Sequence, residues 1–168
     1  MVAALACQLI LLGYHQATTL VDLHPYNGVR FSSGRERHIE AAVNGILMCL
    51  GPVGYAFRLH GLMLYGAIYY FVLFAVEVVI WWIPYFTAPA GKWRSAYNFL
   101  LACVTAGFEP GDALDRWLGV HKRVHGSTLF VLPMRSGRIV PNLEHMLLHG
   151  WTLITAFATL SAYLTSQG

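Results

Sequence analysis

The sequence predicts an all-α integral membrane protein: a bundle of four transmembrane helices with a long cytoplasmic loop between the third and the fourth. Only 11% of the 168 residues are charged, whereas 57% are hydrophobic, and soluble domains carry about 25% charged residues. Four apolar segments reach the roughly 20 helical residues that a hydrocarbon core about 30 Å thick requires. Most Lys and Arg residues lie between these segments, as is typical of membrane proteins with cytoplasmic loops.

The four segments cover residues 2–21, 39–59, 62–87 and 143–164, and residues 1–168 form a single transmembrane domain without an internal linker. The first segment lacks the basic start and the cleavage motif of a signal peptide, so we expect it to stay in the protein as a helix. The connection between the second and third segments is so short that these two must form an antiparallel hairpin.

The loop over residues 88–142 is long enough to contain structure of its own. Within it, residues 93–108 are apolar but short for a span, which favours an interfacial or re-entrant helix. Residues 112–125 follow with acids first and bases last, the order that a helix dipole favours.

The distribution of basic residues predicts the orientation of the chain. Of the 11 Lys and Arg residues, only Arg58 lies in the connection between the second and third segments; the others lie in the two large loops. By the positive-inside rule both large loops are cytoplasmic and both termini extracytoplasmic. The net charge of +3 is too small and too scattered to indicate nucleic-acid binding. Membrane lipid is the expected partner, and a homo-oligomer is compatible with the sequence.

Polar side chains recur on one face of each predicted helix, since residues on one face follow at intervals of three, four or seven. In chain order these are Gln8, His15, Thr19 and Asp22; Glu40 and Asn44; Tyr70, Glu77, Trp81 and Pro84; and His145, His149 and Thr152. The predicted topology places Asp22, Glu40, Glu77, His145 and His149 in the cytoplasmic half of the bundle. We therefore predict a shared polar interior.

Glu77 is the one Asp or Glu residue in the most apolar segment, which has no Lys, Arg or His. An ionised acid at the centre of a bilayer costs about 2.5–3.5 kcal/mol on insertion scales. Intramembrane acids usually face the bundle interior and serve a function. Glu77 is therefore the first candidate for a functional residue.

The leading interpretation is a membrane-embedded enzyme that acts on a lipophilic, isoprenoid- or lipid-like substrate by general acid–base proton transfer. A carboxyl group in a low-dielectric interior can keep its proton at neutral pH and donate it. Nearby aromatic rings stabilise cations, which favours an isomerase, cyclase or lyase reaction without a cofactor. The catalytic candidates are Glu77 as the acid and His149 as its partner, followed by Asp22, Glu40 and His145. The substrate-binding candidates are Tyr70, Trp81, Asn44, His15, Arg30 and Arg37.

A second interpretation is a redox protein that binds iron, zinc or haem. His145 and His149 have the i,i+4 spacing that places two ligands on one helix face, and Glu77 would complete a His/carboxylate set. His15 with a histidine of the fourth segment would hold a haem. Membrane di-iron desaturases and hydroxylases use HxxxH boxes, and two occur here, but that class also needs adjacent histidine pairs, which this chain lacks. The other HxxxH pair, His121 and His125, lies among Lys and Arg residues, and we predict a solvated face for it.

A third interpretation is a small transporter or an accessory subunit of a membrane complex. Transporters usually contain two similar halves, and the two hairpins of this chain do not resemble each other. A subunit would turn its polar stripes toward a partner chain and not toward each other.

Overall fold

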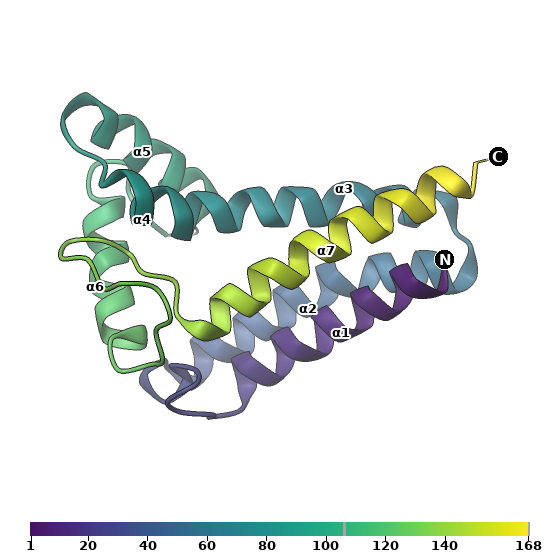
Figure 1. The fold of residues 1–168 in the computed structure, drawn as a ribbon, viewed down its shortest axis with the longest axis horizontal. Coiled ribbons are helices and arrows are strands. Elements are labelled where there is room, and N and C mark those ends of the chain that lie inside the picture. Colours follow the sequence, from purple (N-terminus) through teal and green to yellow (C-terminus); the bar gives the residue numbers. More distant parts are fainter. Residues whose placement is uncertain (106, 168) are drawn as a thin grey trace.

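A computed structural model of the chain describes residues 1–105 and 107–167, which are helical or irregular without any strand (Figure 1). The elements in chain order are α1 (Val2–Leu20), the 3₁₀ turn η1 (Val29–Phe31), α2 (Gly34–Phe57), α3 (His60–Glu77), the π-helical segment η2 (Val78–Trp82), α4 (Ile83–Thr87), α5 (Gly91–Val104), α6 (Ala113–His125) and α7 (Leu143–Thr165).

The prediction that the chain is all-helical is confirmed for the described residues. Three helices are long and apolar enough to cross a membrane: α2 with 24 residues, the continuous run from α3 through η2 to α4 with 28, and α7 with 23. Large apolar side chains on these helices point outward, among them Ile46, Ile68 and Phe157. The fourth predicted span is α1, a helix of 19 residues, and its crossing of the membrane stays a prediction.

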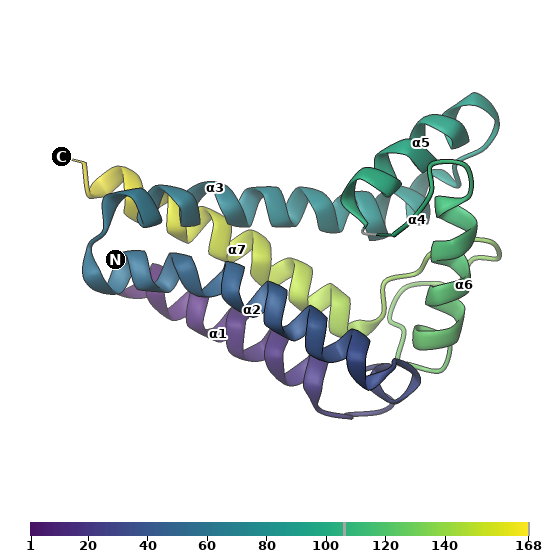
Figure 2. The same cartoon turned by 180° about the vertical axis from the view of Figure 1, so that it is seen from behind.

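The four long helices pack in a closed order: α1 contacts α2 and α7, α2 contacts α3, and α3 contacts α7. Leu11, Met48, Tyr70 and Ala156 form a buried cluster to which each of the four contributes one residue. Both termini lie at the same end of the molecule, where the helices are close together (Figure 1). Toward the other end the run from α3 to α4 diverges from α1, α2 and α7, and α6 lies across this wider end (Figure 2).

The π-helical segment η2 anchors the two loop helices. π-Helical turns are rare in proteins, and those that do occur often lie at functional sites. Here two of its carbonyl oxygens accept hydrogen bonds from outside the segment: Tyr97 of α5 donates to Val79 at 2.7 Å and Trp117 of α6 donates to Ile80 at 2.9 Å. The irregular backbone thus fixes where α6 lies. The loop helix predicted over 93–108 corresponds to α5, and its position relative to a membrane stays a prediction.

The loop after α1 meets α6 at Gly28. A Cβ atom at this position would lie 2.1 Å from the carbonyl oxygen of Val124, so only glycine allows this approach. The contact holds the C-terminal turn of α6, which carries His125.

Replacing Gly28 by alanine is expected to lower the melting temperature, because steric overpacking costs about 1–3 kcal/mol. Gly119→Ala is the matched control, since a Cβ atom there meets open space and alanine favours a helix by up to about 1 kcal/mol over glycine. Thermal unfolding of the detergent-solubilised protein, followed by circular dichroism, measures both effects. Equal melting temperatures for Gly28→Ala and the unmodified protein would show that the loop can move away from α6.

Candidate functional site

Four histidines surround Trp81 at the wide end of the helices. The ring centroid of Trp81 lies 3.9 Å from that of His145, 5.2 Å from His125, 5.7 Å from His121 and 6.1 Å from His149. The two HxxxH pairs, one on α6 and one on α7, therefore form a single cluster. The prediction of a solvated face for His121 and His125 is wrong: both are buried, because α6 packs this face onto Trp81 and η2.

Asn142 links the two histidine pairs through a chain of hydrogen bonds. It caps α7 by accepting from the backbone N–H of His145 at 3.0 Å, and the same amide oxygen is 2.6 Å from Nδ1 of His145. Its amide nitrogen donates to the hydroxyl of Thr128, which donates to the carbonyl of His125 at the end of α6. Asn142 is fully buried, so the start of α7 and the end of α6 are fixed to each other inside the protein.

These partners define the protonation of two rings. A carbonyl oxygen only accepts hydrogen bonds. Nδ1 of His145, facing the amide oxygen of Asn142, therefore carries the proton, and Nε2 keeps its lone pair. His121 is held in the opposite way, with Nε2 donating to the carbonyl of Val140 at 2.9 Å. Metal-binding histidines are commonly oriented by such a bond from the other ring nitrogen.

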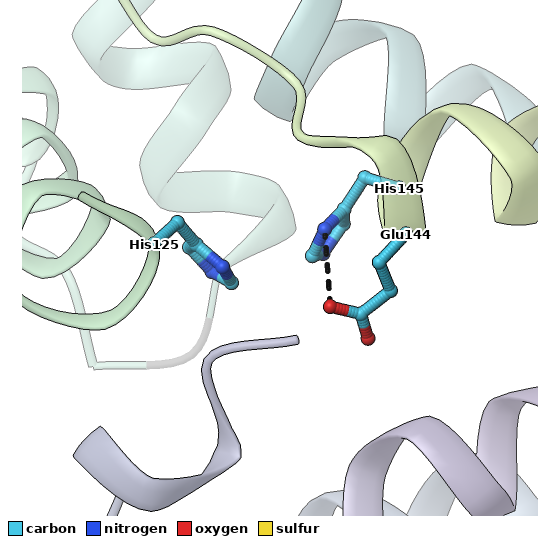
Figure 3. A group of neighbouring side chains, drawn as sticks. All are labelled: His125, Glu144 and His145. Atoms are coloured by element: carbon cyan, nitrogen blue, oxygen red, sulfur yellow. Dashed lines mark ion pairs between the residues drawn. The ribbon is translucent and has the colours of Figure 1, made fainter. Parts of the chain in front are cut away.

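Within the described residues, His125, Glu144 and His145 form a group able to hold a metal ion (Figure 3). One ligand atom from each lies within 4.8 Å of the others. The protonated Nδ1 of His145 separately faces a carboxylate oxygen of Glu144 at 3.9 Å. Two ligands of one zinc ion lie at most about 4.4 Å apart, twice the longest bond, so small side-chain rotations would bring the three into range. The group comes from α6 and from the first turn of α7.

His125 itself is suited to bind a cation. Its Nδ1 is buried and has no hydrogen-bond partner. Burial, together with the nearby His121, lowers the pKa of His125 to about 3, so the ring is neutral at pH 7. A neutral imidazole has the free lone pair that a metal requires.

Glu77 and His149 lie next to the metal group but are bonded differently. Glu77 accepts a hydrogen bond from the hydroxyl of Thr152 at 2.9 Å, and its second oxygen has no partner. His149 accepts from the indole N–H of Trp82 at 3.0 Å through Nδ1. In a neutral ring its Nε2 therefore carries the proton, and this atom too is without a partner. Glu77 and His149 thus each keep one polar side-chain atom without a partner.

Two cavities meet at this cluster. The first, here the His125 cavity, has a volume of about 340 Å³ and lies between α6, η2 and the starts of α2 and α7. The second, here the Glu77 cavity, has a volume of about 280 Å³ and lies between the four long helices. Residues lining both are Glu40, Ile80, Trp81 and His145.

Most of the polar residues predicted for the interior lie around these cavities. Glu40 lines both; His15, Asn44, Glu77 and His149 line the Glu77 cavity. Nε2 of His15, the predicted haem ligand, lies 3.2 Å from the amide nitrogen of Asn44.

Of the other predicted site residues, Asp22, Arg30 and Tyr70 lie away from these cavities, whereas Arg37 lies at one of them. Asp22 is exposed beyond the end of α1 and pairs with Arg30 at 3.1 Å; the hydrogen bond from Arg30 lowers the pKa of this carboxyl group. Tyr70 is fully buried and donates to the carbonyl of Met48. Arg37 lines the His125 cavity.

The sequence did not indicate the roles of Glu144, Asn142 or Trp82. Glu144 and Asn142 stand at the predicted start of a helix, where such residues are common as caps and dipole partners. Trp82 is adjacent to Trp81 and fits an aromatic belt equally well. A signal for Glu144 does exist, because it directly precedes His145 beside the second HxxxH pair.

No family model matches the chain, and searches of curated proteins and of solved structures find no similar protein. The function therefore has to be argued from the site alone.

The hydrogen bonds predict opposite tautomers for two histidines of α7, with the proton on Nδ1 in His145 and on Nε2 in His149. Nitrogen-15 NMR of the protein with labelled histidine, at pH 7 and with metal removed, distinguishes protonated from unprotonated ring nitrogens. His145→Gln and His149→Gln assign the signals, and exposed His60 is the reference. Trp82→Phe is expected to change the signals of His149 alone, because it removes the indole donor. A His149 ring protonated on Nδ1 would contradict the arrangement.

Proposed function

We propose that this chain is a four-span membrane protein that binds one metal ion at His125, Glu144 and His145 and uses it to act on a lipophilic substrate. The observation that carries the proposal is the meeting of three buried or half-buried metal-binding side chains at the junction of two cavities. Burying such a polar side chain costs more free energy when it has no partner than when it has one. A bound cation would supply the partner.

The donor set favours a catalytic ion of zinc or iron. Two histidines and one carboxylate form the ligand set of many catalytic zinc sites and of non-haem iron sites. Three protein ligands leave a coordination position for water or for substrate. Glu40, which lines both cavities, is placed to act as a further ligand or as a base.

The membrane embedding proposed here includes α1 as a fourth span. Its polar residues Gln8 and His15 are buried, while Leu9 and Ile10 are exposed. This pattern fits a helix in lipid with polar groups turned toward its neighbours. The loop after α1 and the segment between α4 and α7 lie at the same end (Figure 1). Together with the excess of Lys and Arg in these segments, this supports cytoplasmic loops and extracytoplasmic termini.

A second candidate is the acid–base enzyme without metal. Glu77 and His149 favour it, because each lines the Glu77 cavity and retains a polar atom without a partner. Glu77 would donate a proton to a lipophilic substrate and His149 would orient it. The polar stripes are buried against one another within the chain, and this favours both enzyme candidates over an accessory subunit.

Metal content tests the leading proposal. Protein purified in detergent, stripped with a chelator and reloaded with zinc or iron(II), is expected to retain about one ion per chain, measured by plasma mass spectrometry after dialysis. Removing a ligand is expected to lower the retained metal at least about tenfold, since loss of even an orienting partner costs 10–100-fold in affinity. His125→Ala removes an imidazole, and Glu144→Gln keeps the shape of the side chain.

His60→Ala is the matched control, because His60 is exposed at the far end of the long helices. Circular dichroism checks that each variant is folded. Retention of one ion per chain by folded Glu144→Gln and His125→Ala would refute the site. A folded protein that takes up neither metal would leave the acid–base candidate.

The orientation is tested separately by reporters fused to the C-terminus. A reporter that is active only outside the cytoplasm is expected to work after Gly168, and a cytoplasmic reporter is expected to be inactive there. The same reporters inserted after Gly137, in the basic loop, should give the opposite result. A cytoplasmic C-terminus would contradict the proposed topology.

A further inference from the structure

The seam between α3 and α7 contains an apolar groove on the outer side of the helices, directly behind His149. The groove has a volume of about 260 Å³ and is lined by Phe74, Val78, Trp82, Met146, His149, Gly150 and Leu153. His149 is the one ionisable residue among these. It also lines the Glu77 cavity on the inner side of the same seam. His149 therefore lies on the boundary between the groove and the cavity.

We propose that the Glu77 cavity binds a single-chain lipophilic alcohol that enters laterally from the membrane through this groove. The inference rests on the proposed function and deepens it, by naming the class of molecule that the metal centre would receive. Both helices of the seam are apolar enough to cross a membrane, so the groove opens toward hydrocarbon chains.

The polar atoms of the cavity identify the alcohol. Glu77 is 7% exposed and His149 is 2% exposed; the first keeps a free carboxyl oxygen and the second a free Nε2–H. A hydroxyl group donates one hydrogen bond and accepts two, so it can pair both with the Nε2–H of His149 and with the carboxyl group of Glu77, whether or not that group is protonated. A hydrocarbon would leave both atoms unpaired, which is unfavourable for buried polar groups.

The walls of the cavity fit the chain of such a molecule. Leu11, Met48, Leu73, Val76 and Leu148 line it together with the polar residues. His145 and Trp81 belong to both cavities, so the Glu77 cavity adjoins the metal group. Ligand sites commonly combine mostly apolar walls with a few polar groups that fix orientation.

Trp82 and His149 form the gate of this route. Their hydrogen bond closes the seam at 3.0 Å, and Trp82 also stacks on Phe86 with ring centroids 5.9 Å apart. Rotation of the indole away from His149 would join the groove to the cavity. Gly150 leaves the groove open, because a Cβ atom there meets nothing within 4 Å.

The test uses the full chain in lipid nanodiscs and a C12 primary alcohol that carries a diazirine and a terminal alkyne. After photolysis, saturable labelling is expected on Leu73, Val76 or Leu148, mapped by mass spectrometry. Dodecanol is expected to compete at least about tenfold better than dodecane, which corresponds to about 1.4 kcal/mol. Glu77→Leu should remove this preference. Gln8→Leu, which removes a buried polar group outside the cavity, should keep it.

Gly150→Phe tests the route, with Gly13→Phe as matched control because Gly13 is also helical, exposed and surrounded by open space. Gly150→Phe is expected to slow labelling at least fivefold, roughly 1 kcal/mol by the same conversion, and Gly13→Phe to leave it unchanged. Equal rates in both variants would overturn the groove as the entrance. Non-saturable labelling, or equal competition by dodecane, would overturn the alcohol site.

All measurements are repeated after chelator treatment. Alcohol binding is expected to persist without metal, since Glu77 and His149 are outside the metal group. Alcohol binding in a protein that takes up no metal would refute the proposed metal centre and leave this inference standing. Metal uptake without alcohol binding would refute this inference and leave the proposed metal centre standing.

Discussion

The hydrogen bonds of Asn142 are the interaction on which the arrangement of the site depends. A single buried amide caps α7, sets the proton position of His145 and reaches the end of α6 through Thr128. Buried amides are costly when unpaired, so the two helix ends cannot separate without losing several bonds together. The histidines of α6 are therefore held against those of α7 although residues 126–142, which contain no helix, lie between the two helices.

The π-helical segment η2 supplies the opposite wall. It places Trp81 against all four histidines, and its carbonyls accept hydrogen bonds from α5 and α6. Two independent devices, a polar chain on one side and an irregular helix on the other, thus converge on α6. A helix that only connects two spans would not need both the Asn142 hydrogen bonds and the hydrogen bonds to η2 to hold it in place. The double attachment makes sense if α6 has to contribute His125 to a site with defined geometry.

Much of the fold follows from the sequence because membrane helices are set by length and apolarity, which are local properties. The inward orientation of Glu77, Trp81 and His149 could also be predicted, because it follows from helical periodicity. What could not be predicted depends on contacts between distant segments. His121 and His125 carry basic neighbours typical of a solvated helix, and only the packing of α6 onto Trp81 buries them. Asp22 matched the periodicity of the polar face, but the helix ends at Leu20, so its carboxylate turns to Arg30 instead.

The distribution of unpaired polar atoms connects the two proposals. The described residues contain seven buried side-chain atoms without a partner, on Gln8, His15, Arg37, Glu77, Asp112, His125 and His149. All but Gln8 and Asp112 belong to residues that line one of the two cavities. Native proteins satisfy the large majority of such atoms, and scattered exceptions would carry little meaning. Their concentration around two adjoining cavities indicates that the interior is built for bound groups: a cation at the side of α6, and a hydroxyl at the side of α3.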